Sequence, residues 1–261
     1  MRGRGLLLLG RASSFGDSNY QLIEQFRWTR RVLSPSYPGL ESVGAVADGL
    51  VRLMDHEKLD KADVFGDALG AGVAQVLARR HPDRIDRIAL ASFGRHSPRR
   101  TLLARLHLGL MRLLPQAAHL ALLRRRMRHM TAMLPNTQRS EIEALIADLV
   151  ERSSKELVLR HLALASDLFD RQREYGLDQP LERCGRVLLL LADDDRNFTA
   201  LEREQLIESW PGAEVHAFVS GGPLLSLTRR GEFGRALDRF YGDVAPRWIS
   251  GPRPPAAEQA H

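Results

Sequence analysis

Short apolar runs alternate along the chain with longer stretches in which apolar residues recur every three or four positions. The short runs are apolar on both faces, as in strands buried between two helix layers; they cover residues 5–10, 31–36, 62–66, 87–92, 186–192 and 214–219. The longer spacing predicts amphipathic helices, including 43–57, 70–81, 199–210 and 230–241. This alternation predicts an α/β fold with a mainly parallel, doubly wound sheet and right-handed crossovers.

The alternation is interrupted at about residues 97–178, where the pattern is helical throughout. Within this stretch, 101–134 combines many leucines with basic residues, and 140–170 is a more evenly charged amphipathic pair. Because the insertion follows the carboxyl end of a strand, we expect it over the ligand-binding edge of the sheet. The predicted organisation is therefore a core formed by 1–96 and 179–245, a helical lid insertion at 97–178 and a disordered tail at 246–261.

Length and composition are consistent with one domain carrying an insertion. The chain has 261 residues, of which 44% are hydrophobic, enough for one large core. Its single cysteine, Cys184, can form no internal disulfide, so the expected location is the cytoplasm. No stretch reaches the roughly 18 uninterrupted apolar residues of a membrane helix, so no transmembrane segment is expected.

Positive charge is concentrated in the predicted lid. The net charge is +6, and the segment from Arg87 to Ser140 contains eleven arginines and no acidic residue. The preference for arginine over lysine is more simply explained by a codon-biased genome than by selection for phosphate binding, and no nucleic-acid partner is expected. Two interpretations of the lid stay open. It can contact an anionic partner, such as a carrier protein or phospholipid headgroups, or it can simply bury its leucines over a pocket.

One junction carries the pattern in which hydrolases mount a nucleophilic serine. It is VFGDALGAGVAQ at residues 64–75, a strand that enters a tight turn and then a helix. Gly66 and Gly70 flank the apex, where the backbone is strained and the adjoining strand and helix leave no room for a Cβ. The apex residue itself is Ala68.

In this context the turn resembles the nucleophile elbow of the α/β-hydrolase family. Residues 31–39 look like the family's strand and loop before its first long helix, and 78–92 look like its elbow helix, His-Pro turn and following strand. The resemblance covers about 5–95 and 185–242 and implies the α/β-hydrolase fold. It also implies that Asp195, or alternatively Asp194, occupies the acid position and that Pro223 occupies the histidine position.

Two members of the implied catalytic triad are thus replaced. Alanine has no lone pair with which to attack, and proline offers no titratable nitrogen at the base position, so hydrolysis through an acyl-enzyme is not expected. The backbone N–H of Leu69, at a helix start, and an N–H from the loop near Arg11 and Ala12 would still form an oxyanion-type site for a carbonyl or carboxylate. Asp67 is expected to orient the turn.

Other residues are weaker candidates for catalysis. His96 follows a strand on the correct edge and is the best substitute base, the alternative being a surface or loop-bonding histidine. Cys184 is expected at the opposite edge, and His216 is expected to pack within the last strand. Asp193, Asp194 and Asp195 are consecutive and point in different directions, without a paired histidine, so neither a metal nor another cofactor is expected.

Within the family the chain is most similar to the maspardin-like branch. The similar segments are 36–75, with a Tyr-Pro turn, LMDHEKLDK and AQ after the elbow, and the SGGPLLSL loop at 220–227. This resemblance implies a noncatalytic protein, a pseudoenzyme that binds a small acyl or carbonyl ligand or a protein partner. The chain departs from maspardin at Ala68, where maspardin keeps serine. The alternative is a lyase, decarboxylase, cyclase or atypical hydrolase acting on a polarised carbonyl, with Asp195, His96 or Asp67 taking part.

Overall fold

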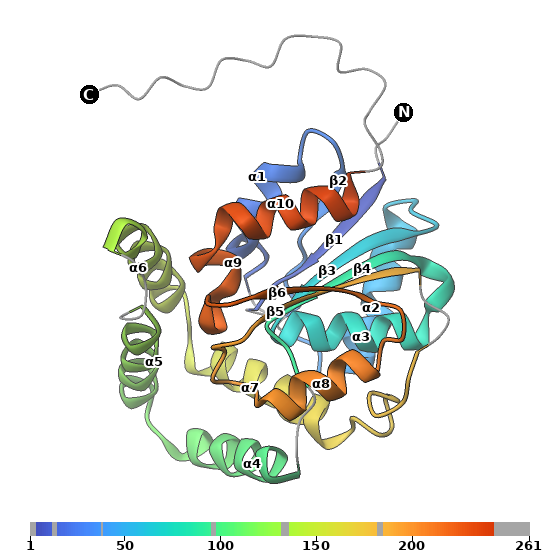
Figure 1. Ribbon diagram of the computed structural model, residues 1–261. Helices are drawn as coiled ribbons and strands as arrows, with labels where there is room; N and C mark the ends of the chain where they lie inside the picture. Colours follow the sequence, from blue (N-terminus) through green and yellow to red (C-terminus); the bar gives the residue numbers. More distant parts are fainter. Residues whose placement is uncertain are drawn as a thin grey trace, which may run out of the picture.

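Six parallel strands form one sheet at the centre of the molecule (Figure 1). The computed structural model describes residues 4–11, 15–37, 39–94, 98–131, 136–181 and 185–242. The sheet order is β2-β1-β3-β4-β5-β6, and all neighbouring strands run parallel. The strands are β1 (Gly5–Leu9), β2 (Arg31–Leu33), β3 (Ala62–Asp67), β4 (Ile85–Ala91), β5 (Arg186–Ala192) and β6 (Glu214–Phe218). The predicted doubly wound parallel sheet is confirmed.

Helices cover both faces of the sheet. One face packs against α1 (Tyr20–Phe26), α9 (Leu225–Thr228) and α10 (Arg230–Tyr241), and the other against α2 (Val43–His56), α3 (Leu69–Arg80) and α8 (Ala200–Glu208). The described residues also include the short 3-10 turns η1 (Gly16–Asn19), η2 (Pro82–Arg84) and η3 (Gly222–Leu224). The helices predicted at 43–57, 70–81, 199–210 and 230–241 correspond to α2, α3, α8 and α10.

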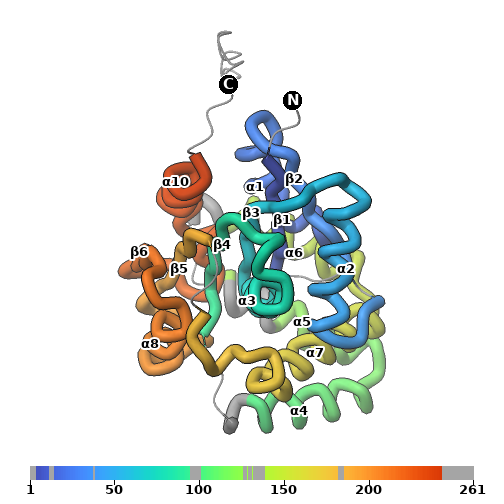
Figure 2. The backbone as a smooth tube through the Cα atoms, turned by 90° about the vertical axis from the view of Figure 1, so that its right-hand side faces the viewer, coloured from blue at the N-terminus to red at the C-terminus, as the bar shows by residue number. Residues whose placement is uncertain are grey.

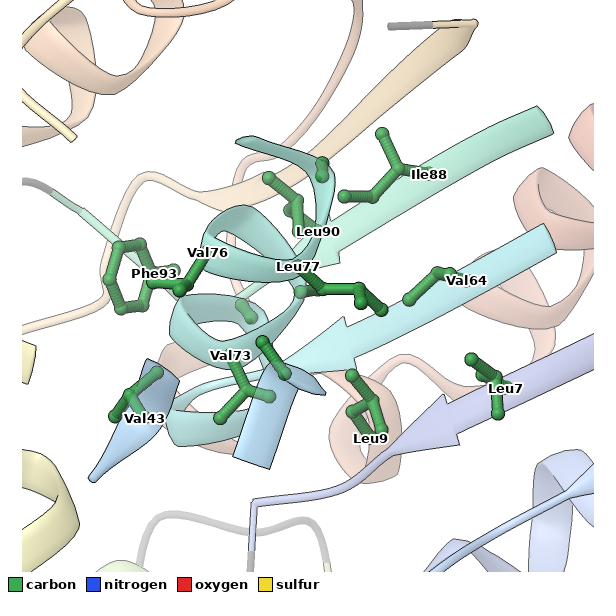
Figure 3. Packing of buried hydrophobic residues seen from close by; sticks show 14 of the residues in the cluster. Leu7, Leu9, Val43, Val64, Val73, Val76, Leu77, Ile88, Leu90 and Phe93 are labelled. Atoms are coloured by element: carbon green, nitrogen blue, oxygen red, sulfur yellow. The ribbon is translucent and has the colours of Figure 1, made fainter. Parts of the chain in front are cut away.

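Alternate strand residues enter two separate hydrophobic clusters. In β1, Leu7 and Leu9 face the α2–α3 layer, whereas Leu6 and Leu8 face the α1–α10 layer. Figure 3 shows the first cluster, in which side chains of three neighbouring strands pack against α3. This two-sided burial explains why the central strands are continuously apolar.

The prediction of two-sided burial is wrong for the edge strand β6. Glu214, Val215 and Ala217 are exposed, and only Phe218 is fully buried. β6 lies at the edge of the sheet and has β5 as its neighbour, so its other edge is not covered by a strand of this sheet. The other edge strand, β2, is intermediate in exposure along its whole length.

The chain changes direction across the sheet between β1 and β3. From β1 it moves to the edge strand β2, then returns to place β3 on the other side of β1. The segments after β1 and β3 therefore leave the same carboxyl edge at adjacent places, a topological switch point where open α/β sheets bind ligands. Arg11 follows the first strand and Ala68 the second.

Between β4 and β5, the described residues form the helices α4 (Pro98–Leu113), α5 (Gln116–Thr131), α6 (Asn136–Glu151) and α7 (Lys155–Asp170). Leu164 and Leu168 of α7 join the main core, and Asp167 accepts hydrogen bonds from Val43 N at 2.8 Å and from the Tyr175 hydroxyl at 2.6 Å. Figure 2 shows α4 along the outer edge of this group. The predicted disordered tail at 246–261 lies outside the described residues.

Within the parts of the chain that the structure describes, none of the helices combines the length and the apolarity needed to span a bilayer.

Candidate functional site at the turn after β3

The turn between β3 and α3 has the strained backbone of an elbow. Ala68 has φ 52° and ψ −113°, conformations that cost a non-glycine residue on the order of 1–3 kcal/mol. A Cβ on Gly66 would lie 2.6 Å from the Cα of Ala71, and one on Gly70 would lie 1.9 Å from the carbonyl oxygen of Leu9. The predicted need for glycine at both flanks is therefore explained by backbone atoms that cannot move aside.

Asp67, beside the apex, is buried and bound by Arg11. The Arg11 Nη2 donates to Asp67 Oδ1 at 2.9 Å and to Oδ2 at 3.1 Å. Burial raises the pKa of the Asp67 carboxyl, while Arg11 and the hydroxyls of Ser92 and Ser226 act in the opposite direction. The predicted turn-orienting residue is thus held by a side chain from the loop after β1. Ala12, predicted to contribute an N–H from that loop, lies outside the described residues.

The two aspartates of the predicted acid position have different surroundings. Asp195 is buried, and its Oδ1 accepts a hydrogen bond from the Asn197 N–H at 2.9 Å. Burial raises the pKa of Asp195, and the nearby Asp67 charge raises it further, while the Asn197 N–H and Arg11 lower it. The pKa of Asp195 therefore depends on the charges of Arg11 and Asp67 as well as on its burial.

Asp194 instead contacts the loop at the predicted histidine position. Its Oδ1 accepts hydrogen bonds from the N–H groups of Gly221 at 2.9 Å and Gly222 at 2.8 Å. Pro223 follows directly in η3 and is half-buried. Asp194, the alternative candidate for the acid position, thus holds this glycine loop. Asp195, the first candidate, instead interacts electrostatically with Arg11 and Asp67 at the elbow.

Asp195→Asn is expected to stabilise the protein at neutral pH and to do so less at about pH 3, below the usual aspartate pKa. Because the folded-state pKa is raised, the folded protein binds this proton more tightly than the unfolded chain. The protonated carboxyl therefore contributes its whole stabilising effect below the pKa of the unfolded chain. This contribution is lost as the pH rises through the pKa of Asp195 in the folded protein. Asparagine cannot ionise and keeps an oxygen for the Asn197 N–H. Urea unfolding at both pH values measures the difference, with the exposed neighbour changed in Asp193→Asn as the control. An equal effect of Asp195→Asn at both pH values would contradict the prediction.

Two cavities meet at the Arg11–Asp67 ion pair. A cavity of about 370 Å³ is bounded by Ala68 and Leu69 of the elbow and by α4, α5 and α7. A second, of about 250 Å³, is bounded by Asp67 and by α1, α6, α7 and α9. Four residues line both cavities: Arg11, Leu123, Val158 and His161. The first cavity can hold a polar group against the elbow, and the second, with leucine, isoleucine and valine side chains in its wall, suits an apolar group.

Histidines of the lid, which sequence reasoning did not single out, also line the first cavity. They are His107, His119 and His161. His119 is buried, and its ring nitrogen lies 2.5 Å from the Met111 carbonyl oxygen, so it has a structural partner. His161 is the one that borders both cavities. Nothing in the sequence except membership of the predicted lid indicated these positions.

The remaining predicted residues fall away from the elbow or outside the description. His216 lies 3.2 Å from the Glu232 carboxylate and packs beside Phe218, so the expected packing role is supported by these contacts. His96 and Cys184 lie outside the described residues. Among the residues that are described, no group of three or more histidine, cysteine, aspartate or glutamate side chains is arranged to hold a metal ion.

The parallel sheet, its two helix layers and the strained turn after β3 define an α/β-hydrolase fold, and solved structures share it over nearly the whole chain. A hydrolase from Pseudomonas aeruginosa PA01 has a TM-score of 0.73 at 16% identity, covering 92% of this chain and 90% of that one. The enol-lactonase from Burkholderia xenovorans LB400 has a TM-score of 0.71 at 17% identity, covering 93% of both chains. A thermophilic esterase from Thermogutta terrifontis has a TM-score of 0.70 at 19% identity, covering 92% and 90%. The predicted fold is confirmed.

Sequence similarity is much more limited. No family model matches the chain. A curated relative described as "Putative carbamate hydrolase RutD", from Caulobacter sp. (strain K31), is 39% identical over 51 residues, 20% of this chain. The match spans about a fifth of that relative's length, 19%.

Proposed function

We propose that this α/β-hydrolase-fold protein is a noncatalytic binding module that takes a small acyl or carbonyl ligand, or a protein partner, at its elbow. The observation that carries the proposal is Ala68, which occupies the strained apex and borders the 370 Å³ cavity. A methyl group there can neither attack a carbonyl nor be activated by a base.

The elbow retains features that suit a ligand oxygen. Leu69 begins α3, so its N–H is one of the unpaired donors at a helix start, where partial positive charge gathers. Arg11 adds a guanidinium at the junction of the two cavities. A ligand with its carbonyl or carboxylate at the elbow and its apolar part in the 250 Å³ cavity would match this distribution of polarity.

The resemblance to the maspardin-like branch supports a role without turnover. It rests on the segments 36–75 and 220–227, the second of which contains Pro223 and the two glycines bound by Asp194. With alanine at the apex and proline at the histidine position, we regard the triad as degenerate. The cytoplasmic location is a further part of this proposal and rests on the single cysteine.

Purified protein is expected to show no hydrolysis of p-nitrophenyl acetate or butyrate and no labelling by a fluorophosphonate probe. Both reactions need an activated serine, and neither an activated serine nor its histidine is present at the predicted positions. The double variant Ala68→Ser with Pro223→His restores both groups, and Ala68→Ser alone is its matched control. A gain of esterase activity in the double variant would indicate that only the triad was lost. Robust labelling or turnover by the unaltered protein would refute the noncatalytic proposal.

A second candidate is a non-hydrolytic enzyme or an atypical hydrolase acting on a carbonyl compound. Asp67, whose carboxyl has a raised pKa, lines the 250 Å³ cavity that His161 also borders. Asp195, also with a raised pKa, is bonded to Asn197, which lines the 370 Å³ cavity. Carboxyls with raised pKa are candidates for general acid–base chemistry. The relative that matches 51 residues of the chain is also described as a putative carbamate hydrolase. Mass spectrometry of any co-purified ligand before and after incubation separates the candidates. An unchanged ligand supports binding alone, and its conversion supports chemistry.

A further inference from the structure

Helix α4 carries a row of exposed leucines on its outer side. The row consists of Leu102, Leu103, Leu106, Leu110 and Leu113, and we call it the leucine stripe. The side chains of these leucines are between 55% and 83% exposed. Since successive helical residues turn by about 100°, the five leucines fall within an arc of about 100° on one face of the helix. A contiguous exposed patch of large apolar side chains is typical of a surface that binds a protein, a membrane or a ligand.

The opposite face of α4 already has its partner within the protein. Leu108 and Met111 are buried, and the helix packs against α7. Arg105 extends that contact through an ion pair with Asp170, in which Nε lies 2.6 Å from Oδ1. The stripe is therefore not the core-facing side of an ordinary amphipathic helix; α4 has two apolar faces, one covered and one open.

Positive charge lies along one edge of the stripe and on the neighbouring helix α5. Residues 98–131, which form α4 and α5, contain eight arginines and neither aspartate nor glutamate. Arg105 and Arg112 are seven residues apart and so follow the same edge of the stripe, and both are exposed. In α5, Arg124, Arg125 and Arg128 are exposed as well. An occupant of this surface must combine apolar groups with negative charge.

A symmetric contact between the stripes of two copies does not meet this requirement. Two molecules joined through the stripe would bring together two segments with eight arginines each and no carboxylate of their own. An anionic bilayer supplies both components, since acyl chains take the leucines and headgroups take the arginines. Figures 1 and 2 both show α4 at the lower edge of the molecule, where a flat surface can approach it.

We propose that α4 docks on an anionic phospholipid surface, lying in the plane of the interface with its leucine stripe toward the acyl chains and its arginines toward the headgroups. This is the geometry of interfacial amphipathic helices, which lie on a bilayer without crossing it. The inner face of the same helix contributes His107 and Met111 to the wall of the 370 Å³ cavity. Docking would thus bring the elbow cavity within one helix diameter, about 10 Å, of the lipid.

Co-sedimentation with vesicles tests the proposal on the full chain. We expect binding to equimolar phosphatidylcholine and phosphatidylglycerol, weaker binding to phosphatidylcholine alone, and loss of binding as salt is added. Leu106→Glu places a charge in the stripe and is expected to weaken binding about tenfold or more. Leu201→Glu is the matched control, because Leu201 of α8 is also 62% exposed but lies outside the stripe. Circular dichroism verifies that both variants fold.

Three results would overturn the assignment. They are equal binding of Leu106→Glu and Leu201→Glu to anionic vesicles, equal binding to neutral and anionic vesicles, and no binding to either kind. Sedimentation velocity adds a further check. A dimer that Leu106→Glu dissociates and Leu201→Glu does not would assign the stripe to a second copy and refute the lipid proposal.

Discussion

Replacing Asp63 by alanine is expected to lower the free energy of unfolding by about 3–5 kcal/mol, because it leaves two buried guanidinium groups without their counter-charge. Asp63 lies in β3 and has no exposed surface. Arg87 donates to its Oδ1 at 3.2 Å, and Arg30 is bonded to its Oδ2. Both arginines are also buried, with side-chain exposures of 6% or less.

The same cluster fixes the C-terminal end of α10 to the sheet. Arg87 donates to the Phe240 carbonyl at 2.9 Å, Arg30 bonds the Tyr241 carbonyl, and the Tyr241 hydroxyl donates to the Val64 carbonyl at 2.7 Å. Loss of Asp63 therefore affects strand and helix together.

Urea unfolding followed by circular dichroism measures the Asp63 effect. Asp55→Ala is the matched control, since Asp55 pairs with Arg84 at 2.7 Å but is 60% exposed, and such surface pairs contribute about 1 kcal/mol or less. If the two variants proved equally stable, the buried pair would not have the structural role assigned to it.

Gly70→Ala is expected to destabilise the fold by about 3 kcal/mol, the upper part of the range for overpacking. The added Cβ would stand 1.9 Å from the Leu9 carbonyl oxygen and 2.8 Å from that of Gly10. Both atoms belong to the backbone at the end of β1, so relief requires α3 to move away from the sheet. The same movement would displace Ala68 and Leu69 and distort the elbow.

Gly109→Ala provides the contrast for Gly70→Ala. Gly109 lies inside α4, and a Cβ there would meet nothing within 4 Å. Alanine in a helix is favoured over glycine by up to about 1 kcal/mol, so this variant is expected to be neutral or slightly stabilising. Thermal unfolding of both variants measures the difference, and a mild effect at Gly70 would show that the turn can relax.

The central strands could be predicted because burial on both faces leaves a continuous apolar run. The first and last residue of each strand could not be predicted in the same way, because an apolar run does not show where the hydrogen bonds between strands begin and end. β4 begins at Ile85, two residues earlier than predicted, and β2 ends at Leu33, shortly before Pro35, which has no N–H to donate to a neighbouring strand. The alternation implied a helix between β1 and β2, but α1 buries only Leu22 and Phe26, too few apolar residues to define its ends.

The elbow could be predicted because the strand, the turn with its two glycines and the helix form one continuous stretch of sequence. The side-chain contacts of the site could not be predicted, because they join residues that are distant in the sequence. Arg11 and Asp67 are 56 positions apart, and only the order of the strands brings them together. His161 comes from the lid, and its approach to the elbow depends on how α7 packs. Asp194 and Asp195 are adjacent in sequence, yet their side chains bind different loops, which residue type alone does not reveal.

The backbone conformation at Ala68 determines how easily a different side chain can be accommodated at the apex during evolution. Its φ of 52° is set by the surrounding strand, helix and glycines, and it persists with alanine at the apex. We therefore expect Ala68→Ser to add a hydroxyl at the apex without a change in the backbone conformation. Under the proposed function, a single substitution at the elbow would supply a hydroxyl nucleophile. A base would also require a change at Pro223, in a loop whose preceding glycines are held by Asp194.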